Sequence, residues 1–188
     1  LHTFTAGGMT LRWFRDCFCQ QETDLSILLG DDSYHLMDRE AALITPGCEG
    51  LIVLPHLNGS MAPDINSKAR GVFFGFTLKH TKPHFIRSIM ESMGYIIRRN
   101  LEAFSAMGIE VNEIRSLGGG AKSRLWNQIK ADITGKPLST VTGPEEARLG
   151  EESLAGSARG IFGRFEEACD SMAMNSRRNI TGKKNQEV

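Results

Sequence analysis

Three consecutive glycines, Gly118–Gly120, constrain this sequence more than any other feature. They follow a short segment, 113–117, that is typical of a strand, and they precede an amphipathic stretch, 123–134, that predicts a helix. Glycine adopts positive φ readily and leaves no Cβ between the peptide N–H groups and a ligand. The first amides of the following helix have no intrahelical partner and lie at the positive end of its dipole. This arrangement suits the phosphates or the ribose of a nucleotide.

The glycine turn fits neither of the two common nucleotide-binding motifs. A Walker loop has glycine directly before Lys-Ser/Thr, but Ala121 precedes Lys122 in this chain. The GxGxxG fingerprint also fails, because Ser123 stands where its last glycine should be. A connecting turn that binds nothing is therefore the alternative. We expect Ser123 to cap the helix and the apolar face of the helix to pack on a sheet. This face consists of Leu125, Trp126, Ile129 and Ile133.

The charge balance and the cysteine pattern exclude several classes of protein. The 188 residues carry 22 basic and 22 acidic side chains, so no global field attracts nucleic acid or a membrane surface. No apolar run reaches the roughly 18 residues of a membrane span, and the first residues do not resemble a signal peptide. The four cysteines and five histidines lack metal-ligand spacing, and such thiols are typical of a reducing cytosol. We expect a cytoplasmic domain with no metal site and with no membrane or nucleic acid partner.

The order of the predicted elements is that of an α/β domain. Helices are predicted over 10–19, 33–43, 81–106, 123–134, 145–159 and 165–174, strands over 51–54, 71–76, 113–117 and 138–141, a loop or short helix over 22–32, and a long loop over 55–68. Residues 175–188 are polar, and we expect a disordered tail after a domain that spans 1–174. Because the chain starts at Leu1 without Met, we expect it to begin inside a longer polypeptide.

Five collinear segments resemble the C-terminal half of the FGGY family of carbohydrate kinases, and look most like its xylulokinase-type branch. They contain a glycine-then-WxRD helix, an LPYLxGxxxP-like loop, the second signature of the family, the glycine turn with its helix, and a final EARLG stretch. The segments are 6–16, 54–63, 69–91, 118–137 and 146–150. The signature matches in residue type and spacing, apart from Phe76 at an aliphatic position. The resemblance covers roughly residues 4–163.

The resemblance implies an actin-like, ribonuclease H-like ATPase domain, in which helices flank a mixed sheet and ATP with Mg²⁺ binds in a cleft between two halves. Only the C-terminal half of that fold is present. The implied cofactor-binding residues are Gly8 and Arg12 on the first helix and Gly118, Gly119, Gly120 and Ser123 at the glycine turn. For Arg12, a solvated surface charge is the alternative.

The resemblance also implies which parts of a kinase this chain lacks. The sugar site and the catalytic Asp base of the family lie in the N-terminal half, and its first strands precede Leu1. We therefore expect the ATP-binding half of a kinase for a sugar or polyol, without catalytic residues of its own and inactive alone. An open sheet edge would favour a homo-oligomer or a partner. Because Glu151 and Glu152 stand at positions that are usually small and apolar in the family, a non-catalytic nucleotide-binding or interaction module is the alternative.

Overall fold

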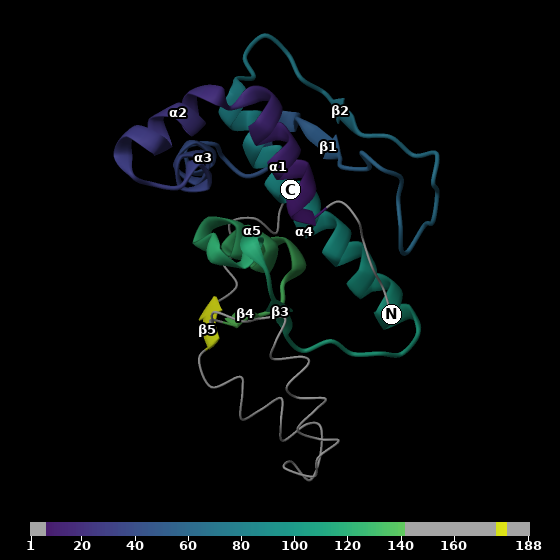
Figure 1. Cartoon of the computed structure of the whole chain (residues 1–188). Helices are drawn as coiled ribbons and strands as arrows, with labels where there is room; N and C mark the ends of the chain where they lie inside the picture. Colours follow the sequence, from purple (N-terminus) through teal and green to yellow (C-terminus); the bar gives the residue numbers. More distant parts are fainter. Residues whose placement is uncertain (1–6, 142–175, 180–188) are drawn as a thin grey trace, which may run out of the picture.

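A layer of helices lies above a small sheet in this computed structural model, which describes residues 7–141 and 176–179 (Figure 1). The helices are α1 (Gly7–Phe18), α2 (Gln20–Leu29), α3 (Ser33–Ala42), α4 (Lys82–Ala106) and α5 (Arg124–Thr134), with short 3-10 turns η1 (Cys48–Gly50) and η2 (Gly119–Lys122). The strands are β1 (Ile52–Leu54), β2 (Val72–Phe74), β3 (Ile114–Ser116), β4 (Leu138–Val141) and β5 (Ser176–Asn179). Within the described residues, no helix is long and apolar enough to cross a membrane.

The strands form two separate sheets. The strands β1 and β2 make an antiparallel pair in which Val53 lies opposite Phe73. In the second sheet β3 and β4 are parallel, with Arg115 opposite Ser139, and β5 is antiparallel to β4. Parallel neighbours need a crossover connection, and α5 supplies it. The predicted succession of strand, glycine turn and helix is therefore present.

The polar end of the chain differs from our expectation. We expected residues 175–188 to form a disordered tail, but Ser176–Asn179 forms β5 and pairs with β4 along its whole length. A strand edge offers main-chain donors and acceptors that any extended segment can pair with, whatever its side chains. Composition predicts side-chain burial and therefore missed this pairing. The helices predicted over 145–159 and 165–174 lie outside the described residues.

The hydrophobic core lies along α4, the 25-residue helix that runs diagonally through the molecule (Figure 1). Ile86, Ile89 and Met90 are fully buried in its first half. The buried arc of α4 also includes polar and charged residues such as Arg87, Ser88 and Glu91, so it is wider than a single apolar stripe. It is wider because α1, α3, α5 and β1 all contact α4.

The apolar face of α5 packs chiefly against α4, whereas the sequence analysis expected it to pack on a sheet. Trp126 and Ile133 are buried at this contact. A Cβ built on Gly94 of α4 would lie 2.6 Å from Cδ1 of Ile133, so the two helices approach closely because residue 94 is glycine. An amphipathic pattern predicts which face of a helix is buried, but it does not predict which element covers that face.

Four consecutive residues with positive φ, 47–50, connect α3 to β1. Two of them, Cys48 and Glu49, are not glycine, and such residues rarely adopt this conformation. The turn is held by Glu91 of α4, whose carboxylate oxygens accept the N–H of Gly47 at 3.1 and 3.2 Å. Glu91, the last residue of the family signature, thus has a structural role.

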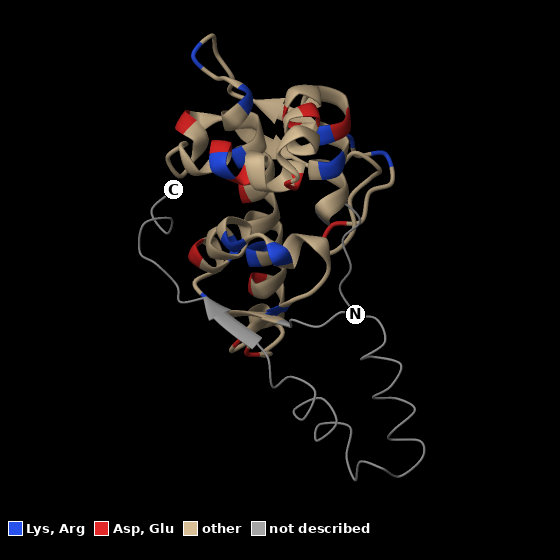
Figure 2. Ribbon diagram, turned by 60° about the vertical axis from the view of Figure 1, so that its left-hand side comes forward, with Lys and Arg blue, Asp and Glu red and all other residues tan. Residues whose placement is uncertain are grey.

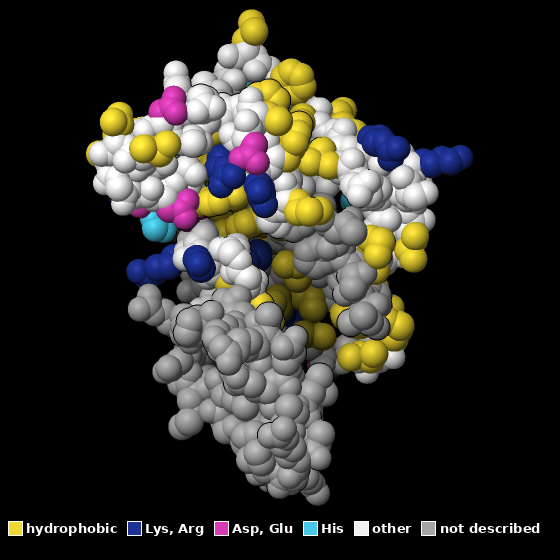
Figure 3. All heavy atoms as spheres, viewed as in Figure 1, with side chains coloured by type: hydrophobic (Ala, Val, Ile, Leu, Met, Phe, Trp, Pro, Cys, Tyr) yellow, Lys and Arg dark blue, Asp and Glu magenta, His cyan; other side chains and the backbone are white. Residues whose placement is uncertain are grey.

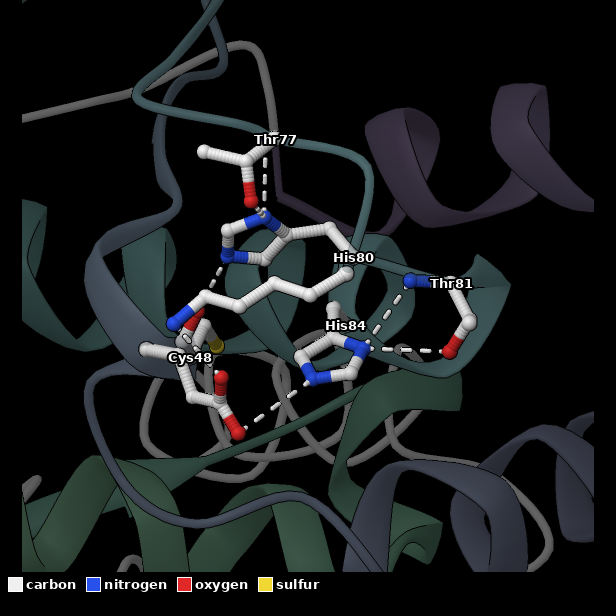
Figure 4. Close-up of polar contacts among 7 residues, drawn as sticks. Cys48, Thr77, His80, Thr81 and His84 are labelled. Atoms are coloured by element: carbon white, nitrogen blue, oxygen red, sulfur yellow. Dashed lines mark hydrogen bonds and ion pairs between the residues drawn. The ribbon is translucent and has the colours of Figure 1, made fainter.

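Two histidines hold the other side of this turn (Figure 4). Nδ1 of His80 accepts the N–H of Thr77 at 2.8 Å, so its Nε2 carries the proton and donates to the carbonyl oxygen of Cys48 at 3.2 Å. Nδ1 of His84 accepts the N–H of Thr81 at 3.1 Å and completes the cap of α4. The two rings meet edge to face with centroids 5.2 Å apart. The sequence analysis found no metal-ligand spacing among the histidines and did not predict that these two support neighbouring loops.

Hydrophobic side chains also reach the surface, as the upper part of the face in Figure 3 shows. On the β1–β2 pair, one face carries Val53 and Phe73, which pack on the core. The residues of the other face are exposed and all apolar: Ile52, Leu54, Val72 and Phe74. Contiguous apolar surface of this kind often marks an interaction site.

Candidate functional site

A cavity of about 1090 Å³ lies between the glycine turn and the helices α1, α3 and α4. Its volume is slightly above the usual range of small-molecule sites, roughly 300–1,000 Å³. All six residues that the resemblance implied lie along it: Gly8, Arg12, Gly118, Gly119, Gly120 and Ser123. Two segments more than a hundred positions apart in the sequence therefore meet at one cavity.

The structural constraints on the three glycines at this cavity differ. Gly118 has φ of +81°, a conformation in which any other residue would be strained. A Cβ on Gly118 or on Gly119 would meet no atom within 4 Å, so open space surrounds both. A Cβ on Gly120 would lie 3.1 Å from the ring of Trp126. Gly120 thus has a packing reason to be glycine, whereas at Gly119 neither packing nor backbone strain requires it.

Ser123 caps α5, as the sequence predicted. Its Oγ accepts the N–H of Trp126 at 2.9 Å. The carboxylate of Asp38 on α3 lines the same cavity as Ser123. Burial raises the pKa of Asp38 above its ordinary value, although the nearby Ser123 hydroxyl acts in the opposite direction. The start of α5 and the helix α3 therefore meet at the cavity.

Gly8 and Arg12 lie on α1 at the opposite side of the same cavity. Gly8 is exposed, and a Cβ there would meet no atom within 4 Å. The Arg12 side chain is 71% exposed, and its Nε is 3.7 Å from Oδ2 of Asp16. Arg12 thus lines the cavity and at the same time carries a solvated charge that Asp16 partly balances.

The sequence analysis missed Lys130 of α5, which also lines the cavity. This lysine is only 7% exposed, and its Nζ donates to Oγ of Ser116 at 3.0 Å. The amine lies 5.4 Å from the centre of the Trp126 ring. Burial lowers the pKa of Lys130 to about 8. Its position directly after Ile129, on the buried side of an amphipathic helix, is the signal that could have identified it.

Charges of both signs surround the cavity. The basic residues along it are Arg12, Arg115, Lys122 and Lys130, and the acidic ones are Asp32, Asp38 and Glu113. Figure 2 shows the same mixture of signs over the helices. The cavity can therefore take a ligand that has an anionic part and also hydrogen-bond donors.

A second cavity, of about 500 Å³, lies under the long loop that follows β1. The loop contributes residues 55–56 and 59–64, and α4 contributes Tyr95 and Arg99. Arg99 forms an ion pair with Asp64 of the loop. None of the six residues implied by the resemblance lines this cavity.

Comparison with known proteins relates the chain to sugar kinases. Residues 2–159 match the C-terminal domain of the FGGY family of carbohydrate kinases. The chain is 34% identical to the gluconokinase of Bacillus subtilis over 172 residues, which cover 91% of this chain and 34% of that protein. It is 31% identical to the xylulose kinase of Staphylococcus epidermidis over 166 residues, which cover 88% of this chain and 32% of that protein.

Solved structures also match the fold of this chain. The crystal structure of a gluconate kinase from Lactobacillus acidophilus matches with a TM-score of 0.77 and 25% sequence identity, covering 97% of this chain and 35% of that one. The chain thus spans about a third of the length of the relatives that it matches.

Proposed function

The chain belongs to the FGGY family of carbohydrate kinases and has their actin-like ATPase fold, and we propose that it forms the part of such a kinase that binds ATP. In this proposal the γ-phosphoryl group of ATP is transferred to a hydroxyl of a sugar or polyol. The main support for this proposal is that residues of α1 and of the glycine turn line the same cavity. The place of action would be the cytoplasm, where ATP is available.

The cavity offers groups that suit each part of ATP. The first amides of α1 have no intrahelical partner, and together with the helix dipole they favour phosphate. Gly118 and Gly119 leave the backbone open to close approach. The cations Lys122 and Lys130 balance negative charge. Apolar side chains of α4 supply a wall for the base: Met93, Ile97, Leu101 and Phe104.

Magnesium would be bound mainly through the phosphates. Within residues 7–141 and 176–179, no three His, Cys, Asp or Glu side chains are grouped so that they could hold a metal ion. Mg²⁺ usually keeps several waters and binds substrate phosphates with only one or two carboxylates, so no protein cage is required. When bound, Mg²⁺ neutralises charge on the transferred phosphoryl group, while the residues of this chain orient the nucleotide.

Phosphoryl transfer also needs a sugar pocket and a base that takes the proton of the sugar hydroxyl. The family resemblance assigns both to the N-terminal half, and the chain spans about a third of its relatives. We therefore expect these 188 residues to bind ATP without phosphorylating a sugar. The names of the relatives, gluconokinase and xylulose kinase, indicate the class of substrate to supply with the missing half.

Calorimetry with ATP and Mg²⁺ on the chain and on a Gly119→Val variant tests this proposal. Because a Cβ at Gly119 meets no atom within 4 Å, the variant should unfold at the same temperature as the original chain. The added side chain would occupy the space of the ligand, so the heat of binding should disappear. Half of a cleft buries less ligand than a closed one, so we expect weak binding by the original chain. Equal heats for both proteins would exclude the glycine turn as the site.

A coupled kinase assay with gluconate, xylulose and glycerol tests whether the chain can phosphorylate these compounds without the N-terminal half. We expect no ATP-dependent phosphorylation by the isolated chain. Turnover of any of these compounds by the chain alone would show that it contains its own base and sugar pocket.

A further inference from the structure

The amine of Lys130 lies in the wall of the large cavity. Its Nζ donates to Oγ of Ser116, two residues before the glycine turn, at 3.0 Å, and is 5.4 Å from the centre of the Trp126 ring. Lys130, Ser116 and Trp126 all line this cavity. Because both groups that the amine contacts border the cavity, a ligand there comes within reach of the amine.

This amine has no counter-charge among residues 7–141 and 176–179. An ammonium group has three protons to donate, and Ser116 accepts one of them. No carboxylate in this part of the chain forms an ion pair with Lys130, and burial alone accounts for the lowering of its pKa. A buried charge without a partner is unfavourable. An anion that enters the cavity would supply the missing partner.

The other charged groups at the cavity leave Lys130 as the cation in excess. The residues of α4 that line the cavity are uncharged. Three carboxylates line it, and three cations other than Lys130 match them in number. The charged and titratable groups along the cavity, apart from Lys130, are Arg12 on α1, Asp32, His35 and Asp38 at α3, Glu113 and Arg115 at β3, and Lys122 on η2.

Burial distinguishes Lys130 from the other lysine at the cavity. Lys122 is exposed, so water and salt screen its charge. Lys130 is only 7% exposed, and a cation attracts an anion more strongly where less water surrounds the two charges. Lys130 should therefore contribute more than Lys122 to the binding of a phosphate.

Burial also leaves the amine only partly charged while no anion is bound. Because its pKa is lowered to about 8, about half of the free chains lack this charge at that pH. A phosphate beside the amine favours the charged form. A chain whose amine is neutral must therefore take a proton from the solvent when phosphate binds.

Building on the proposed ATP site, we propose that Lys130 binds a phosphate group of the nucleotide and takes up a proton from the solvent as it does so. The open backbone of Gly118 and Gly119 borders the same cavity and leaves room for the phosphate. The affinity for nucleotide then falls as the pH rises above about 8, because the complex holds a proton that the free chain has lost. A nucleoside without phosphate lacks this dependence.

Equilibrium dialysis of ADP against the 188-residue chain at about pH 7.5 and about pH 9.5 tests this inference, since the phosphates of ADP are ionised throughout this range. We expect the dissociation constant to rise roughly tenfold between the two values, because each pH unit above the pKa of a coupled group changes the affinity by up to about tenfold. Adenosine should show no such rise. Lys130→Gln keeps a donor for Ser116 without the charge, so it should bind ADP more weakly at the lower pH and show almost no further change at the higher one.

Lys122→Gln is the matched control, because it removes the same charge from an exposed position at the same cavity. We expect it to retain the rise of the dissociation constant with pH. The melting temperature of each variant at both pH values shows whether it is folded. Calorimetry on the original chain needs no variant: in buffers with different heats of ionisation at about pH 8, binding of ADP should take up roughly half a proton.

A parallel titration with inorganic pyrophosphate separates this inference from the proposed function. Proton uptake with ADP, together with loss of the pH dependence in Lys130→Gln, supports the role of Lys130. If ADP binds without proton uptake, or if Lys130→Gln keeps the pH dependence, Lys130 does not bind the phosphate and the ATP site stands. If pyrophosphate binds with proton uptake but ADP does not bind, the anion site stands and the proposed function fails. If neither compound binds, both proposals fail.

Discussion

The indole Nε1 of Trp126 donates a 2.9 Å hydrogen bond to the backbone carbonyl of Met90, and this bond joins α5 to the middle of α4. Both side chains are buried. The same indole ring fills the space beside Gly120 and lies under the amine of Lys130. Trp126 thus connects the glycine turn to the hydrophobic core.

Replacing Trp126 by Phe should lower the free energy of unfolding by about 2–4 kcal/mol. The change removes a buried hydrogen bond and leaves a cavity, whereas the carbonyl of Met90 keeps its partner within α4. Urea denaturation followed by circular dichroism measures the effect. Trp13→Phe is the control: this tryptophan is 36% exposed, and its loss should cost less than about 1 kcal/mol. Equal losses for the two variants would show that Trp126 is not the main connection.

The close contact of α4 and α5 at Gly94 leads to a second prediction. In Gly94→Ala the new Cβ would lie 2.6 Å from Cδ1 of Ile133, so the helices must separate. We expect a loss of about 1–3 kcal/mol in the free energy of unfolding although alanine is the better helix former. Adding Ile133→Val removes the clashing methyl group, so the double variant should be more stable than the sum of the two single changes predicts. Strict additivity in denaturation experiments would mean that the two residues do not touch.

A buried pair of carboxyl groups makes stability depend on pH. Lys82 forms an ion pair with Glu22, which is hydrogen-bonded to Glu40. Burial and the charge and hydrogen bond of Glu22 raise the pKa of Glu40 from 4.5 to about 7. Burial alone would raise the pKa of Glu22 as well, but the hydrogen bond from Lys82 holds it below its ordinary value. Glu40 is therefore the member of the pair that keeps its proton.

Between about pH 4.5 and pH 7 the folded chain holds a proton on Glu40 that the unfolded chain has lost. The contribution of Glu40 to stability must therefore fall as pH rises through this range and stay low above it. Gln remains neutral and can still donate to Glu22. The melting temperature of Glu40→Gln, relative to that of the original chain, should then rise from pH 5 to pH 8. The exposed Glu110→Gln should show no such trend, and parallel curves for Glu40→Gln would contradict the assignment.

Local signals in the sequence predicted the features that depend on neighbouring residues. Ser123 caps α5, and the helices over 33–43 and 81–106 end within one residue of their predicted bounds. Five collinear segments were sufficient to identify the family, and the comparisons confirm both the resemblance and the actin-like fold. These predictions succeeded because caps, breakers and periodicity act over a few positions.

Features that depend on tertiary contact were missed. Asp38 is separated from Ser123 by more than eighty positions, so no spacing rule relates them. The sequence analysis did not single out Lys130, which is buried and donates a hydrogen bond to Ser116 at the end of β3. The strand β5 forms through main-chain pairing, which polar composition does not reveal. The nucleotide roles of Gly8, Arg12 and the glycine turn stay predictions, although the structure brings these residues to one cavity.

Photoaffinity labelling with 8-azido-ATP tests most directly whether that cavity binds the nucleotide. After irradiation and digestion of the 188-residue chain, mass spectrometry identifies the labelled peptides. We predict label in peptides that contain residues 7–16, 32–38 or 117–130, and we predict that excess ATP, but not excess gluconate, prevents it. Label confined to residues 55–64, at the second cavity, or label that ATP does not displace, would contradict the account.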